Sequence, residues 1–168
     1  GDTTTKDFPL LKGKEFMMEA VFHGAKGHAY TDMPGNFNGT VKDVLSLNLS
    51  DNFERALFIA SLNAVMRHLG LISHTVHCRD KEPEICALEL VDFILRFYGS
   101  PSIGLIGFQP AMAGQLSKYF SLRITDLDPD NIGNEKFGIM IESPEQIDRM
   151  LTCSDLILAT GSTVVNST

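Results

Sequence analysis

Residues 102–107 read S-I-G-L-I-G, a short and almost entirely apolar run that decides the fold class of the second half of the chain. A run of this kind is typical of a strand that is buried on both faces of a parallel sheet. A helical stretch at 111–119 and a second apolar run at 122–127 follow it. The order strand, helix, strand is that of a unit whose strands run parallel.

The same alternation continues to the end of the sequence. The runs at 138–142 and 155–160 predict two further strands, and Ser143 and Pro144 open a helix between them that reaches Leu151. Together these elements predict a Rossmann-like, mostly parallel sheet with helices on its faces.

The first half of the chain has a different pattern. Residues 15–32 hold two apolar-rich runs around a glycine-containing turn at 23–27, which predicts a β-hairpin. The strongest helix signal begins after Asp51, the predicted N-cap, with Glu54 three residues on to complete a capping box. Gly70 supplies its C-terminal stop.

A further helix is predicted from Pro83 to Gly99, where the hydrophobic period changes. We therefore expect an α+β module at residues 1–99 and an α/β module at 100–168. The length of 168 residues by itself suits one ordinary domain or two small ones, and an apolar content of 43% is enough to bury a sizeable core.

Charge excludes two classes of partner. The chain has 14 lysines and arginines against 21 aspartates and glutamates, a net charge of −7, and no basic cluster. We therefore expect it to bind neither nucleic acid nor an anionic membrane surface. Its three cysteines are irregularly spaced, which argues against a disulfide framework and predicts a cytoplasmic protein.

The carboxyl ends of the predicted strands are the places to search for a ligand site. The first strand runs into Gly107, Gln109 and Pro110, where a flexible backbone meets a helix N-terminus that suits an anion. The spacing is not G-x-G-x-x-G, and Pro110 lacks a donor N–H. A tight turn between strand and helix explains the glycine equally well.

The second strand ends in T-D-L-D-P-D at 125–130. Asp126 follows Gly107 by 19 residues, near the place of a ribose-binding acid in dinucleotide folds. Asp126 and Asp128 share one face of an extended backbone and can hold a hydroxyl group or a hard cation together. The same residues are also ordinary turn formers.

The last strand ends in A-T-G-S-T-V-V-N at 159–166. Thr160, Ser162 and Thr163 supply three hydroxyl groups around Gly161, which suits an oxyanion or a phosphate. Simple N-capping of the next helix is the alternative. No histidine and acid accompany Ser162 in the nearby sequence, and the sequence assigns no reaction.

A separate cluster carries the ligands of a soft metal. It reads His74-x-x-His77-Cys78, with Cys86 eight residues on. Imidazole and thiolate suit zinc, nickel and copper, although this spacing matches no closed structural zinc pattern. We take these residues as candidate ligands of a transition-metal ion.

Three segments resemble a known family: S-I-G-L-I-G-F-Q-P-A at 102–111, I-T-D-L-D-P-D-N-I-G at 124–133 and S-D-L-I-L-A-T-G-S-T-V-V-N-S-T at 154–168. They are similar to the domain-of-unknown-function family described as putative heavy-metal chelation, and A-S-L-N-A-V at 60–65 resembles the partner domain of the same proteins.

The resemblance implies an enolase N-terminal-like domain packed on a Rossmann-like domain, with a ligand site in the cleft between them. Asn63, in an otherwise apolar helix, is either a contribution of the partner domain to this site or a core asparagine bonded to backbone. The match places the following residues around the cleft: Gly107, Gln109, Pro110, Asp126, Asp128, Thr160, Gly161, Ser162, Thr163 and Asn166.

Members of the family continue beyond T-G-S-T-x-x-N, so this chain resembles a short or truncated member. A sheet that ends in D-L-I-L-A-T at 155–160 would leave an apolar edge strand uncovered, which favours pairing with another chain. We expect a homo-oligomer that covers this edge, or else a shortened gene product.

Two functions from different classes follow. The first is binding of a heavy metal or metal complex in the cleft, with a transition-metal ion as the cofactor. The alternative is a Rossmann-like enzyme or sensor that binds a nucleotide-like or other anionic small molecule at the strand ends. A third reading is a structural remnant without activity.

Overall fold

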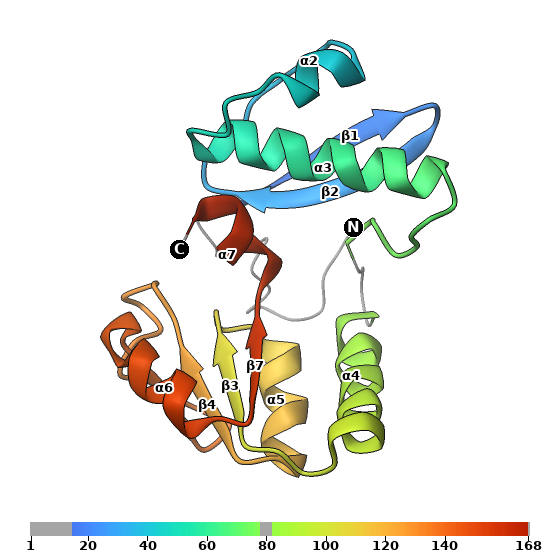
Figure 1. Ribbon diagram of the computed structural model, residues 1–168. Coiled ribbons are helices and arrows are strands. Elements are labelled where there is room, and N and C mark those ends of the chain that lie inside the picture. Colours follow the sequence, from blue (N-terminus) through green and yellow to red (C-terminus); the bar gives the residue numbers. More distant parts are fainter. Residues whose placement is uncertain (1–14, 78–81, 168) are drawn as a thin grey trace. The chain divides into compact units, whose positions relative to one another are not determined.

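The computed structural model describes residues 15–77 and 82–167 (Figure 1). Their contacts divide them into two compact units. The sheet unit consists of residues 82–160, and the hairpin unit joins residues 15–77 to residues 161–167. None of the described helices is long and apolar enough to cross a membrane.

The sheet unit contains a five-stranded sheet with the order β5-β6-β4-β3-β7. Strands β6, β4, β3 and β7 run parallel, and only β5 is antiparallel to its neighbour. The mixed α/β class with a mostly parallel sheet, expected from the sequence, is thereby confirmed. The strands are β3 (Ile103–Ile106), β4 (Leu122–Thr125), β5 (Glu135–Lys136), β6 (Ile139–Glu142) and β7 (Leu156–Ala159).

Helices cover both faces of this sheet (Figure 1). Helices α4 (Glu82–Tyr98) and α5 (Pro110–Tyr119) share one core with alternate residues of the strands. The 3₁₀ turn η1 (Pro144–Gln146) leads into α6 (Ile147–Cys153) on the other side. There the buried Met150 lies so close to Gly104 that a Cβ at this position would be 2.6 Å from Met150 Cγ.

The core of the sheet unit explains where the chain divides. The contacts place α4 in the sheet unit, so this division by contacts lies before α4, while the change of hydrophobic period lies after it, near Gly99. Val91 and Ile94 of α4 are buried in the same cluster as Ile103 and Leu116, because the apolar stripe of the helix packs beside α5.

The described part of the hairpin unit is built from an antiparallel hairpin and three helices. Helix α3 packs across both strands, and α7 packs against β2 and α3. The predicted hairpin and the long helix are both present. The elements are β1 (Phe16–Phe22), β2 (Ala25–Thr31), α2 (Val41–Leu45), α3 (Asn52–His68) and α7 (Gly161–Asn166).

The hairpin turn is tighter than the predicted segment 23–27. Phe22 pairs with Ala25, so His23 and Gly24 alone form the turn, with φ angles of 47° and 82°. Two central residues with positive φ fit the right-handed twist of the strands. Gly27 therefore lies within β2, where a different requirement selects it.

Gly27 is the point of closest approach between the hairpin and α3. A Cβ at this position would lie 2.8 Å from Asn63 Cβ and closer still to the backbone atoms Ala60 O and Ala64 N. Small residues continue this contact in the core, where Ala29, Ala56, Ala60 and Val165 cluster. The hairpin thus packs directly on the helix backbone, which only small residues permit.

The N-terminus of α3 differs in one detail from the predicted capping box. Asp51 is the N-cap, and its side chain accepts a hydrogen bond of 2.8 Å from Glu54 N. The Glu54 carboxylate, however, accepts from Ser50 N at 3.2 Å instead of from the N-cap itself. A complete capping box occurs at α2, between Thr40 and Asp43.

Candidate functional site

Three of the predicted ligand residues meet at the carboxyl edge of the parallel sheet. Ile106 of β3 pairs with Thr125 of β4 and with Ala159 of β7, so the residues that follow each strand are neighbours. Gly107 N donates to Thr125 O at 2.9 Å, and Thr160 N donates to Ile106 O at 3.1 Å. The strand ends therefore bring Gly107, Asp126 and Thr160 together.

Gly107 satisfies two requirements at this edge. Its φ of 90° is one that L side chains rarely adopt, and a Cβ would lie 2.8 Å from both Thr160 Oγ1 and Thr160 Cγ2. Glycine has no side chain to clash here and adopts this φ readily, so the chain can leave β3 and enter α5 within three residues. The tight-turn interpretation of this glycine is thus supported by geometry.

The carboxylate of Asp126 binds backbone on both sides. Its Oδ2 accepts from Phe108 N at 2.6 Å, and its Oδ1 accepts from Asp128 N at 2.7 Å. Asp126 therefore fastens the loop after β3 to the loop after β4. A ligand at this residue would have to use the remaining lone pairs of the two oxygens.

Asp128 continues the same turn. Its Oδ1 accepts from Asp130 N at 3.1 Å, and its carbonyl accepts from Asn131 N at 2.9 Å. The turn-forming alternative for these aspartates is thus observed. It leaves the proposed ligand role of Asp128 as a prediction.

The loop residues that open α5 keep polar groups available. Gln109 is the N-cap, but its side chain makes no capping hydrogen bond, and Pro110 is the first helical residue. Both residues are half-buried. The Gln109 amide and the first N–H groups of α5 are therefore candidate donors at this edge.

The predicted residues beyond Thr160 belong to the hairpin unit. Val165 is buried against β2 and α3, and its carbonyl accepts from Arg55 Nε at 2.7 Å. Asn166 Nδ2 donates to Glu15 Oε1 at 2.8 Å. The predicted ligand set is thus divided at Thr160. The residues on α7 are Gly161, Ser162, Thr163 and Asn166.

Arg55 was not singled out by the sequence, yet it anchors this last helix. Besides the bond to Val165, its Nη1 donates to Leu49 O at 2.8 Å and its Nη2 donates to Asn52 Oδ1. A guanidinium group can satisfy several carbonyls at once. The available signal was a basic residue in an otherwise apolar helix.

The predicted metal ligands His74 and His77 do not form a metal centre with other described residues. His74 is exposed, and its Nδ1 lies 3.0 Å from Ser73 Oγ. The His77 ring stands edge-on to Tyr30, with centroids 5.0 Å apart. Cys78 lies outside the described residues. Within residues 15–77 and 82–167, no three His, Cys, Asp or Glu side chains are grouped to hold a metal ion.

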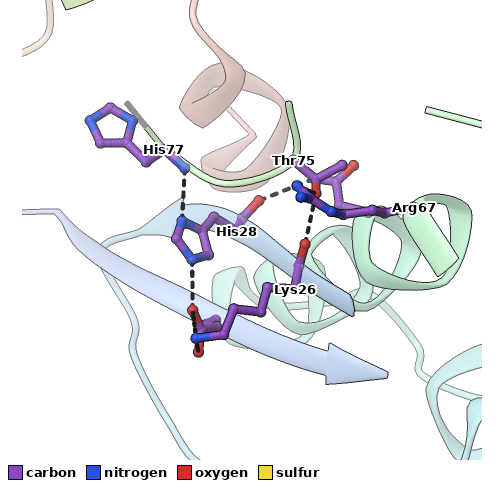
Figure 2. Close-up of polar contacts among 7 residues, drawn as sticks. Lys26, His28, Arg67, Thr75 and His77 are labelled. Carbon is purple, nitrogen blue, oxygen red and sulfur yellow. Dashed lines mark hydrogen bonds and ion pairs between the residues drawn. The ribbon is translucent and has the colours of Figure 1, made fainter. Parts of the chain in front are cut away.

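The segment that carries these histidines is bound to the hairpin through Thr75. Figure 2 shows Thr75 between Lys26 and Arg67. Its buried hydroxyl donates to Lys26 O at 2.7 Å and accepts from Arg67 Nη1 at 3.1 Å, while its carbonyl accepts from His28 N at 2.9 Å. This network, which sequence reasoning missed, holds the segment along β2.

His28 extends the network on the other side of the segment (Figure 2). Its Nδ1 accepts from His77 N at 2.9 Å, so the ring proton is on Nε2, which donates to Glu19 Oε2 at 2.9 Å. The hydrogen bond from His28, followed by that from Lys26, lowers the pKa of Glu19. Both ring nitrogens of His28 are therefore occupied by protein atoms.

Asn63 has the structural role among its two predicted alternatives. Its Nδ2 donates to His28 O at 3.1 Å, beside the close approach at Gly27. The asparagine therefore satisfies a hairpin carbonyl from α3.

Comparison with known proteins finds a family model that matches the second half of the chain. The model of the family described as putative heavy-metal chelation, DUF364, matches residues 89–168. The resemblance predicted from the sequence is confirmed. A search of the curated proteins finds no match.

A solved structure of the DUF364 family shares the fold. It is a protein with unknown function from Desulfitobacterium hafniense, with 15% sequence identity and a TM-score of 0.57. The match covers 90% of this chain and 60% of that one, so the present chain spans less than two thirds of the longer protein. The DUF364 match includes every predicted strand-end residue and excludes His74 and His77.

Proposed function

We propose that this chain binds a heavy-metal ion, free or held in a small organic complex, at the carboxyl ends of β3, β4 and β7. The observation that carries the proposal is the family match, whose residues 89–168 include all three strand ends. The convergence of Gly107, Asp126 and Thr160 at one edge supports this placement, because ligands of open α/β sheets bind there.

The donors at this edge favour a metal that is already in a complex. The polar side chains here carry amide, carboxylate and hydroxyl groups (Gln109, Asp128 and Thr160), whereas soft metal ions prefer imidazole and thiolate. Such side chains suit hydrogen bonds to the organic part of a complex. The net charge of −7 favours a complex that is neutral or positive.

Two finer predictions belong to the same proposal. They are the enolase N-terminal-like character of the first module and the Rossmann-like character of the second. The family resemblance supports them. The alternative of a nucleotide-like ligand is not better supported, since Asp126 already accepts two backbone N–H groups.

The proposal includes a homo-oligomer. Among the strands that the structure describes, β7 pairs only with β3, and its sequence L-I-L-A has neither a charge nor a proline. Such an edge favours pairing with a second chain. Analytical ultracentrifugation should show a dimer or larger assembly at micromolar concentration, and a stable monomer at high concentration would remove this part of the proposal.

Calorimetry with two nickel probes tests the ligand. Untagged protein is titrated with nickel chloride and with the neutral nickel–histidine complex, with free histidine as the blank. We expect the complex to bind, and Thr160→Val and Gln109→Ala to weaken it by about tenfold each, the cost of about one hydrogen bond. Thr152→Val and Gln115→Ala are the matched controls and should bind like the parent.

Two results would overturn the proposal. One is that neither nickel probe binds at micromolar concentration. The other is that the strand-end variants and the matched controls bind the complex equally well, since the donors at this edge would then have no part in recognition.

A further inference from the structure

Two histidines outside the predicted ligand sets lie face to face on the hairpin unit. His23 is in the turn between β1 and β2, and His68 is the last residue of α3. Their ring centroids are 5.0 Å apart, and the planes are 28° from parallel. Phe22 meets both rings edge-on, at 4.5 Å from His23 and 5.3 Å from His68. We call these two side chains the His23–His68 pair.

The nitrogens of this pair are available to a ligand. Both residues are exposed, and neither ring makes a hydrogen bond or ion pair with another residue in the described ranges. His28 on the same unit differs, because its two nitrogens are bound to His77 N and to Glu19. Packing of the turn on the helix end requires aromatic surface, which Phe22 supplies, but it does not require two imidazoles.

The distance between the rings fits two ligands of one metal ion. Imidazole nitrogens bind zinc and similar ions at about 2.0–2.1 Å, which puts each ring centre roughly 3.2 Å from the ion. Adjacent ligands at tetrahedral or square-planar angles then have centres about 4.5–5.2 Å apart. The observed 5.0 Å lies in this range. The observed rings are stacked, so each must turn about its Cβ–Cγ bond for one nitrogen of each ring to face the same ion.

The backbone holds the two ligands in place before a metal arrives. Position 23 is fixed by a two-residue turn, and position 68 by the end of a 17-residue helix that packs across the same hairpin. Binding through the second imidazole is therefore intramolecular, with a high effective concentration. Two exposed histidines at unrelated surface positions would lack this advantage.

We propose that the His23–His68 pair binds a divalent transition-metal ion, with water in the remaining coordination positions. Among the divalent ions, Cu²⁺ binds most tightly, followed by Ni²⁺ and Zn²⁺, while Mg²⁺ and Ca²⁺ do not bind, because imidazole suits the former and oxygen ligands the latter. This site is separate from the strand-end site and does not depend on it.

Copper titration of single variants tests the site. Untagged protein is titrated with Cu²⁺ in a weakly coordinating buffer, and the number of equatorial nitrogens is read by electron paramagnetic resonance. His23→Asn keeps a residue that tolerates the left-handed turn, and His68→Gln keeps a helix former. Each should weaken Cu²⁺ binding by about 100-fold, because the intramolecular advantage is lost. The double variant should bind more weakly than either single variant, because each single variant keeps one imidazole ligand.

A control variant and a strand-end variant distinguish copper binding at the His23–His68 pair from binding at the strand-end site. Lys42→Gln, on the exposed surface of α2, should bind Cu²⁺ like the parent. If both single variants retain parental affinity, or the spectrum shows one equatorial nitrogen, the pair is not the site. If copper binding is lost in Thr160→Val and retained in His68→Gln, the strand-end proposal stands and this one is overturned.

Discussion

Replacement of Gly27 by alanine tests the packing on which the hairpin unit depends. The added Cβ would lie 2.8 Å from Asn63 Cβ, 0.6 Å inside the 3.4 Å at which ordinary contact begins, and it would come closer still to backbone atoms of Ala60 and Ala64. Main-chain atoms in the middle of α3 cannot turn away as a side chain does. The hairpin and the helix would have to separate, which also lengthens the Asn63 bond to His28 O.

The expected cost is at the upper end of what overpacking produces. Extra methylene groups in a packed core cost about 1–3 kcal/mol, and we expect about 3 kcal/mol for Gly27→Ala because the backbone must move. With an m-value of about 1–3 kcal/mol per M, the urea midpoint of the hairpin unit should fall by roughly 1–3 M. Hydrogen exchange of β2 and α3 amides, read by mass spectrometry, reports this unit separately from the sheet unit.

Alanine variants at two other glycines serve as references for the loss of stability in Gly27→Ala. At Gly104 a Cβ would meet Met150 and Ile157 side-chain atoms at 2.6–2.9 Å, and these flexible ends can give way, so Gly104→Ala should cost less. Gly161 has no atom within 4 Å of the added Cβ, and alanine there should be neutral or slightly stabilising in α7. A Gly27→Ala protein with the parental midpoint, or one less affected than Gly104→Ala, would refute the packing argument.

Three other predictions concern the polar contacts. Thr75→Val keeps the shape of a buried side chain but leaves Lys26 O without its donor, so the free energy of unfolding should fall by about 1–3 kcal/mol, measured by urea denaturation. Asp126→Ala removes the acceptor of two backbone N–H groups and should cost about 1.5–3 kcal/mol, with faster exchange of the Phe108 amide, whereas a variant with unchanged exchange would show that Asp126 does not hold this loop. Hydrogen bonds from the Ser102 side chain and then its backbone lower the pKa of Asp155, so the stability they contribute is complete above the ordinary aspartate pKa and is lost as the pH falls through the lowered value. Asp155→Asn should reduce this acid dependence, and equal acid titration curves for parent and variant would contradict it.

The regular elements were largely predictable because their signals are local. The apolar run at 103–106 became β3, and the Asp51 side chain caps α3 as its spacing with Glu54 indicated. Strand β5 was missed, since the two exposed residues Glu135–Lys136 carry no apolar pattern. Its pairing with β6 depends on the turn between them, which hydrophobic periodicity does not report.

The candidate site was predictable in position and only partly in chemistry. Strands β4 and β7 both pair with β3 in parallel, so the residues after the three strands, at 107, 126 and 160, are expected to lie side by side. The sequence does not predict that the Asp126 carboxylate accepts two backbone N–H groups. A carboxylate at a strand end uses the same oxygen atoms to bind a ligand or to hold a loop. Which of the two it does depends on where the neighbouring loop lies.

The sequence by itself determined which segments are helices and strands, that the second half has a mostly parallel sheet, and the family resemblance. Only the tertiary structure decided that α4 joins the sheet unit, that α7 joins the hairpin unit through Val165 and Arg55, and that His23 meets His68. The physical reason is the range of the interactions. Capping and periodicity act within a few residues, whereas these contacts join positions far apart in the chain, and their partners are chosen by packing and by unsatisfied carbonyl groups.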